Sequence, residues 1–235
     1  MKILNKIFLR GRNFLFPEDC ALCETALIEP NEMRLGLCLD CLSITSDCGS
    51  KCTICGKPLI SEIDTCLHCR GAQPSYDRLW TVFPYMGKYR KLLSEYKFGI
   101  KLPLADFFAE QITEIIKKEP LLENAVIVPV PPRPGKIKKN GWDQVEYLVK
   151  RLEKLMPDVT VSRCLKRSKS KVQKELNRND RLNNLKGRIV INGKAPDIAL
   201  LIDDVITTGA TIEVCSDELK NNGTQKVYGI CVFYD

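Results

Sequence analysis

The feature that most constrains the fold is the stretch 200–211, which reads LLIDDVITTGAT. Aliphatic residues lead into two adjacent acids, Asp203 and Asp204, and then into a turn of small and hydroxyl-bearing residues. An amphipathic pattern over residues 211–221 follows the turn. This order predicts a buried strand, a ligand loop at the carboxyl end of that strand, and a helix that begins in the loop.

The same stretch has the chemistry of a site for a phosphorylated sugar. Backbone N–H groups at a helix start, together with the helix dipole, attract a phosphate dianion. The hydroxyls of Thr207, Thr208 and Thr211 add donors, and Gly209 allows a close backbone approach. The two acids could accept hydrogen bonds from vicinal hydroxyls, directly or through a divalent cation. We therefore expect a ribose 5-phosphate ligand; the alternative is an ordinary strand–turn–helix with a threonine cap.

The second strong feature is a series of four C-x-x-C pairs before residue 70. Such pairs present two thiolates to one ion, and two pairs complete a tetrahedral Zn²⁺ site. Eight ligands predict two structural Cys₄ sites, and we prefer sequential to cross-braced pairing. A redox dithiol is the alternative, but it needs one pair beside a βαβ unit. The predicted metal ligands are Cys20, Cys23, Cys38, Cys41, Cys52, Cys55, Cys66 and Cys69.

Alternating strand and helix patterns fill the rest of the chain. Strands are expected over 79–85, 125–131, 188–192, 198–202 and 226–234, and helices over 86–96, 104–117, 145–155 and 211–221. This alternation predicts an α/β fold with a parallel sheet flanked by helices. Residues 1–16 suggest either a membrane-surface helix or, as we prefer, a helix docked on the protein.

The net charge of +7 is concentrated in one segment. Residues 163–188 contain ten Lys or Arg residues and two acids, and 166–186 has few apolar residues, so a basic mobile loop is expected there. A local anionic ligand explains this pattern better than general adhesion to nucleic acid. No secretory signal and no membrane-spanning stretch is evident, and the cysteine spacing suits metal binding in a reducing cytoplasm.

Residues 200–211 resemble the PRPP-binding motif of type I phosphoribosyltransferases: an aliphatic strand, two acids, and Thr-Thr-Gly-x-Thr. The wider layout resembles the ComF family of competence-protein-F-like (GntX-like) phosphoribosyltransferase homologues over nearly the full chain. The matching residues are FP-x-x-C at 16–20, the cysteine pairs, VPVP at 128–131, GWDQ at 141–144 and Q-x-x-L-x₄-R-x-x-N at 173–184. Asn140 and Asp143 depart from the family, which usually has Arg and Asn there, so Lys139 is a possible substitute for the arginine.

The resemblance implies roles for particular residues. Asp203 and Asp204 would be catalytic, holding the ribose hydroxyls, and Mg²⁺ would accompany PRPP. The PRPP-binding loop would comprise Val205, Ile206, Thr207, Thr208, Gly209, Ala210 and Thr211. The residues expected to hold the pyrophosphate, in the loop after the first core strand and in the mobile loop, are Pro131, Arg133, Arg167, Lys169 and Lys171.

Two functional hypotheses follow. The first is a phosphoribosyltransferase with an unknown acceptor and a role in competence and DNA uptake. The second is a non-catalytic PRPP- or nucleotide-binding partner of a helicase-like or single-stranded-DNA-handling protein; a zinc-mediated scaffold is a third, weaker possibility. Direct DNA contact is left open, because no basic stripe is interleaved with aromatic residues. The expected division is an N-terminal helix and double zinc-ribbon-like module at 1–72 and a phosphoribosyltransferase-like domain at 73–235.

Overall fold

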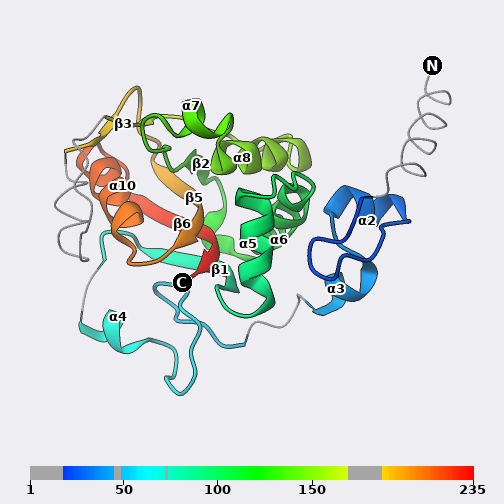
Figure 1. Cartoon of the computed structure of the whole chain (residues 1–235). Coiled ribbons are helices and arrows are strands. Elements are labelled where there is room, and N and C mark those ends of the chain that lie inside the picture. The colour runs from blue at the N-terminus through cyan, green and yellow to red at the C-terminus, as the bar shows by residue number, and fades with distance from the viewer. Residues whose placement is uncertain (1–17, 45–48, 72–73, 169–186) are drawn as a thin grey trace. The chain divides into compact units, whose positions relative to one another are not determined.

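The structure is a computed structural model that describes residues 18–44, 49–71, 74–168 and 187–235 (Figure 1). The chain contacts divide it into two compact units. The first holds described residues 18–44 and 86–107, and the second holds 49–71, 74–85, 108–168 and 187–235. Among the described helices, none combines the length and apolar character needed to cross a membrane. The predicted helix over residues 1–16 lies outside the described residues.

The second unit is built on a four-stranded sheet in the order β1-β6-β5-β2, with every pair of neighbours parallel. This confirms the parallel sheet predicted from the alternating patterns. The strands are β1 (Arg78–Pro84), β2 (Val126–Pro129), β5 (Ile198–Ile206) and β6 (Lys226–Tyr234). The two inner strands, β5 and β6, are buried along most of their length, as their aliphatic runs require. Pro84 ends β1, which lies at the edge of the sheet, where a missing N–H is tolerated.

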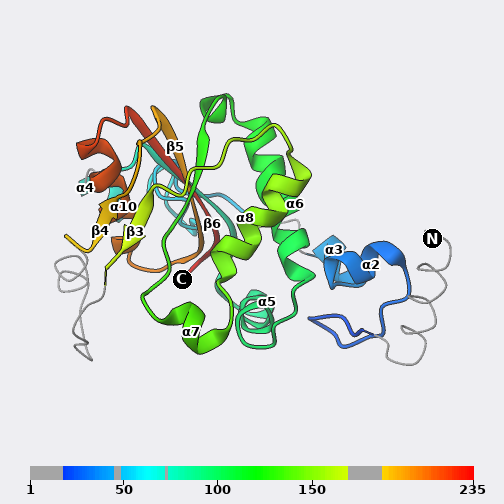
Figure 2. The same cartoon turned by 90° about the horizontal axis from the view of Figure 1, so that it is seen from above.

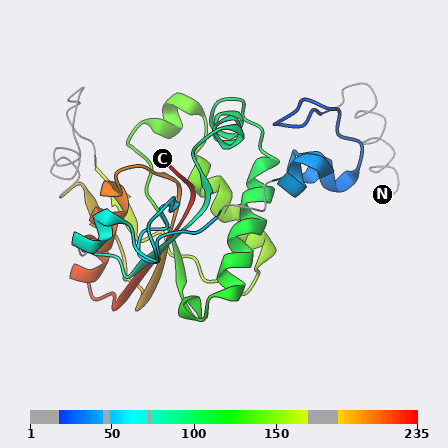
Figure 3. The ribbon, with the colours of Figure 1, turned by 90° about the horizontal axis from the view of Figure 1, so that it is seen from below.

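Helices cover both faces of this sheet (Figures 2 and 3). On one side lie α6 (Leu104–Lys118) and α8 (Gln144–Leu155), and on the other lies α10 (Ala210–Asn221). Phe108 of α6 packs against the sheet, with ring centroids 6.3 Å from Phe83 and 5.4 Å from Phe233. The short elements are α4 (Leu67–Gly71), η1 (Pro120–Leu122) and α7 (Lys136–Asn140).

A small antiparallel ladder accompanies α10 on its side of the sheet. It pairs β3 (Leu165–Arg167) with β4 (Ile189–Ile191), and the N–H of Ile191 donates to the Glu218 carboxylate of α10 at 3.0 Å. The expected loop over 166–186 therefore begins too early, because Lys166 and Arg167 belong to a strand that pairs with β4. Residues 169–186, including Lys169 and Lys171, lie outside the described residues.

The first unit contains α2 (Pro30–Leu35), α3 (Leu39–Ile44) and α5 (Lys88–Lys97). Its N-terminal cysteine-bearing segment is tied to the segment around α5 by lysines. Lys91 Nζ bonds the Leu22 carbonyl at 3.0 Å and the Glu24 carboxylate at 2.7 Å, and Lys101 Nζ bonds the Asp19 carbonyl at 3.0 Å. The predicted division into domains 1–72 and 73–235 remains a prediction.

Candidate functional site

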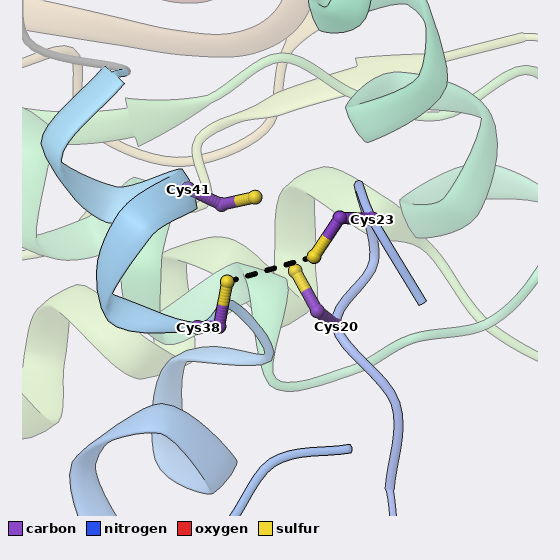
Figure 4. A group of neighbouring side chains, drawn as sticks. All are labelled: Cys20, Cys23, Cys38 and Cys41. Carbon is purple, nitrogen blue, oxygen red and sulfur yellow. Dashed lines mark hydrogen bonds between the residues drawn. The ribbon is translucent and has the colours of Figure 1, made fainter. Parts of the chain in front are cut away.

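The eight paired cysteines form two groups in the order expected from sequential pairing. Cys20, Cys23, Cys38 and Cys41 make the first group, and Cys52, Cys55, Cys66 and Cys69 the second; within each, the sulfur atoms lie within 4.8 Å of one another. In the first group, Cys20 and Cys23 face Cys38 and Cys41, and all four sulfurs converge (Figure 4). His68, within the last C-x-x-C pair, is not a member of either group.

The spacing of the sulfur atoms suits a tetrahedral metal site. Cys23 Sγ lies 3.6 Å from Cys38 Sγ, and Cys55 Sγ lies 3.8 Å from Cys66 Sγ. Four thiolates at about 2.3 Å from a zinc ion are separated by about 3.8 Å, whereas a disulfide holds its sulfurs at about 2.05 Å. The described cysteines are all free of disulfides. Both groups could therefore hold zinc.

Backbone donors favour the ionised form of one thiol in the second group. Burial raises the pKa of the Cys52 thiol, but backbone hydrogen bonds from Cys55, Cys66 and Ile54 outweigh burial and lower this pKa to about 7. The N–H of Cys66 points at Cys52 Sγ at 3.4 Å. Because the thiolate is the metal-binding form, these bonds prepare the site for a cation.

The second group is built directly onto the edge of the sheet. The N–H of Leu79 in β1 donates to the Ile54 carbonyl at 2.7 Å, and Lys51 Nζ bonds the carbonyls of Thr81 and Val82 at 2.6 and 2.8 Å. Gly56, at φ +68°, passes so close that a Cβ there would lie 2.9 Å from the Leu79 carbonyl oxygen. This cysteine-bearing turn therefore satisfies backbone groups that an edge strand otherwise exposes.

The predicted phosphate loop, 205–211, covers the end of β5, the turn 207–209 and the start of α10, because β5 continues past the expected strand end at residue 202 to Ile206. Asp203 and Asp204 are in β5, Asp204 is buried, and its N–H donates to Asp203 Oδ1 at 2.8 Å. Gly209 is in the left-handed conformation, at φ +76°, and is the N-cap residue of α10. Gly209 has no side chain to cap the helix, so the first turn of α10 keeps backbone amides that can bind an anion, although the Ala210 N–H bonds Thr208 Oγ1.

The other members of the loop differ in exposure. Thr207 is exposed, Val205, Thr208 and Thr211 are partly buried, and Ile206 and Ala210 are buried in the core. The Ala210 N–H lies 3.5 Å from Thr208 Oγ1. The hydroxyl-bearing residues are thus all at least partly accessible, and Ile206 and Ala210 hold the loop to the core.

The segment after β2 runs beside the acid pair. Pro129 pairs with Ile202, and the Val130 N–H donates to the Ile202 carbonyl at 3.0 Å, immediately before Asp203. Pro131 is buried and Arg133 is exposed. Since β2 and β5 are adjacent and parallel, the Pro131–Arg133 segment and the phosphate loop leave the sheet at the same edge.

Arg167 has two other arginines, Arg133 and Arg188, and the acid Asp203 among its charged neighbours. Arg167, at the end of β3, is half-buried; burial lowers the pKa of its guanidinium, and the charges of Arg133 and Arg188 lower it further, while Asp203 opposes them. A bound anion would reduce the repulsion between these positively charged side chains. Arg188 is not among the site residues predicted from the sequence. The signal that could have found it is its place at the start of the predicted strand 188–192, which pairs with the strand that ends at Arg167.

Asp143 has a structural role that the sequence did not indicate. Its Oδ1 accepts the Glu146 N–H at 2.8 Å as the N-cap of α8, and its Oδ2 pairs with Lys136 Nζ at 2.8 Å. The departure from Asn at this position is therefore balanced by a lysine on α7. The side chains of Lys139 and Asn140 lie outside those described.

Beneath the acid pair are two inert thiols. Cys215 of α10 and Cys231 of β6 are both fully buried, and the pKa of each thiol is raised by burial and by the charge of Asp203. Cys231 is the register partner of Asp203 in β6. A thiol that stays protonated is a poor nucleophile, so these cysteines contribute packing rather than chemistry.

The sheet, its flanking helices, and the strand–acid–loop–helix unit at its carboxyl edge define the class. This is an α/β protein with a type I phosphoribosyltransferase-like fold that also carries two Cys₄ groups.

Comparisons with known proteins extend this assignment. No family model matches the chain. Competence protein ComFC of Streptococcus pneumoniae strain R6 is 31% identical over 195 residues, which cover 81% of this chain and 84% of that protein. Competence protein F of Haemophilus influenzae is 25% identical over 185 residues, 75% of this chain and 81% of that protein. DNA utilization protein YhgH of Escherichia coli K12 is 24% identical over 225 residues, 92% and 96% of the two chains. The chain belongs to the ComF family of competence proteins.

Solved structures with some likeness are phosphoribosyltransferases. A hypoxanthine phosphoribosyltransferase from Staphylococcus aureus matches over 56% of this chain and 63% of that chain, with 14% identity and a TM-score of 0.36. A purine phosphoribosyltransferase from Pyrococcus horikoshii matches over 56% and 82%, with 20% identity and a TM-score of 0.35. Scores this low carry no argument about the site, and the family assignment rests on the sequence relatives.

Proposed function

We propose that this protein binds PRPP with Mg²⁺ at the β5–α10 loop and transfers or releases its phosphoribosyl group, with loss of pyrophosphate. The observation that carries the proposal is that acidic groups, a helix N-terminus and an arginine lie together at one edge of the sheet. The acid pair suits a ribose diol, the start of α10 suits the 5-phosphate, and Arg167, which interacts with Asp203 and has Arg133 and Arg188 as neighbours, suits a polyanion.

In this proposal the residues of the chain position PRPP and stabilise the charges that develop as it reacts. Asp203 and Asp204 hold the ribose hydroxyls and stabilise positive charge that develops on the ribose ring as the bond to pyrophosphate breaks. The 207–211 loop anchors the 5-phosphate, and Arg133 and Arg167 stabilise the departing pyrophosphate. Bound Mg²⁺ would supply further neutralisation of the pyrophosphate charge, with the carboxylates of Asp203 and Asp204 as the candidate oxygen ligands in this loop.

A second candidate function is PRPP or nucleotide binding without turnover, as part of a DNA-uptake machine. The half-buried Arg167 favours anion binding in either case, whereas turnover also requires an acceptor. We propose that a helicase-like or single-stranded-DNA-handling protein is the partner, as the resemblance to the ComF family implies; the relatives are named as competence proteins. Direct DNA contact by this chain is left as a question for binding measurements.

The discriminating experiment measures PRPP binding and PRPP-dependent pyrophosphate release with Mg²⁺ in the wild type and in Asp203→Asn. The matched control is Asp197→Asn, since Asp197 is an exposed acid just before the opposite end of the same strand. Transfer predicts release that Asp203→Asn abolishes and Asp197→Asn preserves. Tight PRPP binding without release under any acceptor would favour the non-catalytic function, and no PRPP binding would exclude both and leave a zinc-mediated scaffold.

We also propose that both Cys₄ groups hold structural Zn²⁺ in the cytoplasm. Each group presents four sulfur atoms at zinc-like spacing, and thiolates remain metal ligands only while reduced. Measuring two zinc ions per chain in protein purified under reducing conditions supports this assignment. Iron in place of zinc, or disulfides within the pairs, would contradict it.

A further inference from the structure

The segment 75–77, which follows the second Cys₄ group in the chain, is bonded to α10. The N–H and Oγ of Ser75 donate to Glu213 Oε1 at 2.9 and 2.8 Å, and the same hydroxyl contacts the Asp217 carboxylate. Glu213 lies in the first turn of α10, directly after the phosphate loop. Asp77 instead pairs with Lys220 in the last turn, at 3.0 Å. This segment therefore holds α10 at both ends.

The second Cys₄ group and α10 also share one hydrophobic core. All four cysteines are buried in the same cluster as Ala210, Ile212, Val214 and Leu219, and Ile54 and Leu59 of the cysteine-bearing turn pack against that cluster. Tyr76, between the two polar contacts, is buried in it as well. Moving this turn would therefore disturb the buried face of α10, the helix that begins in the phosphate loop.

The orientation of the Glu213 carboxylate affects whether the start of α10 can bind an anion. A carboxylate in the first turn of a helix is attracted to the same amide groups that would bind a phosphate. With both Ser75 donors on Glu213, the carboxylate is satisfied away from the loop. Without them, Glu213 is free to compete with an anionic ligand or to repel it.

We infer that the second Cys₄ group, acting through Ser75, positions the start of α10 and so sets the affinity of the phosphate loop; this inference rests on the proposed PRPP function. The two Cys₄ groups are then not equivalent. The first belongs to the unit with α2, α3 and α5, whereas the second is part of the ligand-binding unit. Ser75 is a positioning residue in this scheme and does not touch the ligand.

The test uses the full-length, metal-loaded protein and Ser75→Ala, with Asp77→Asn as the matched control from the same segment. Dissociation constants for PRPP with Mg²⁺ are measured by calorimetry, and hydrogen exchange is followed for the backbone amides of residues 210–214. Ser75→Ala should weaken PRPP binding by about five- to tenfold, at the lower end of typical coupling between sites, and should speed that exchange. Metal content should stay unchanged, and Ser75→Thr, which keeps a hydroxyl, should restore affinity.

Two results would overturn the inference. One is wild-type affinity and exchange in Ser75→Ala; the other is equal weakening by Asp77→Asn, which would show that the effect belongs to the anchoring of α10 as a whole and not to its start. Cys23→Ser removes a ligand of the first group and should leave PRPP affinity unchanged; weakening equal to that of Ser75→Ala would contradict the distinction between the groups. If wild-type protein fails to bind PRPP, the proposed function fails, while the exchange rates at 210–214 still decide whether Ser75 positions α10.

Discussion

Gly56→Ala tests whether the second cysteine-bearing turn is fastened to the sheet. A non-glycine residue in the left-handed region costs about 1–2 kcal/mol, offset by up to about 1 kcal/mol from the stiffer unfolded chain. At Gly56 the new methyl would also lie 2.9 Å from both the Leu79 carbonyl oxygen and the Thr81 N. Since both contacts are backbone atoms, the turn and β1 must separate.

Separation weakens the hydrogen bond from Leu79 to Ile54 and the bond from Thr81 Oγ1 to the Gly56 carbonyl, each worth about 1 kcal/mol. The total loss of unfolding free energy for Gly56→Ala is then about 2–3 kcal/mol. Gly49→Ala is the matched control, because Gly49 has φ +63° but nothing within 4 Å of the added Cβ. Its expected loss is at most about 1 kcal/mol.

Guanidinium unfolding of the zinc-loaded proteins, followed by tryptophan fluorescence, measures both losses. The strand β1 carries Trp80, one of the two tryptophans of the chain, so part of the signal reports on the sheet edge; the other part comes from Trp142. Equal losses in Gly56→Ala and Gly49→Ala would refute the reasoning, because they would show that backbone conformation alone accounts for the effect and that the turn is not in close contact with β1.

Two further predictions concern ionisable groups. Glu32 is buried, and its carboxylate accepts hydrogen bonds from the backbone N–H groups of Glu29, Leu39 and Ile28, which lower its pKa. The ionised form therefore stabilises the folded first unit above the unfolded pKa of about 4.3. That stabilisation is lost as the pH falls through the lower pKa of the folded state. The difference in thermal midpoint between wild type and Glu32→Gln should therefore be largest near neutral pH and shrink in acid, and a constant difference would contradict this. Lys136→Met should cost about 2 kcal/mol in denaturant unfolding, because the Asp143 side chain is only 3% exposed and loses its ion-pair partner. Adding Asp143→Asn, which can still cap α8, should recover most of the loss; no recovery would show that the lysine acts by packing.

Much of the fold could be predicted because local patterns dominate it. The aliphatic run 200–202, the acids and the Thr-Thr-Gly turn occur in one continuous stretch, so strand, loop and helix start followed from periodicity alone. The cysteine spacing likewise predicted two groups with sequential pairing, since each C-x-x-C turn is a local structure. Arg167 was assigned to a loop because β3 is only three residues long and its pairing with β4 crosses a long intervening segment.

The sequence by itself determined which residues are the candidates for the chemistry: the acid pair, the hydroxyl-rich loop and the eight thiols. Only the tertiary structure decided which of these work together, because that depends on contacts between residues distant in the chain. It brought Arg188 and Asp203 to Arg167, tied Ser75 to Glu213 across 138 positions, and placed the second Cys₄ group in the same core as α10. The physical reason is that antiparallel β3–β4 pairing, long-range hydrogen bonds and the shared hydrophobic core join segments that lie far apart in the sequence.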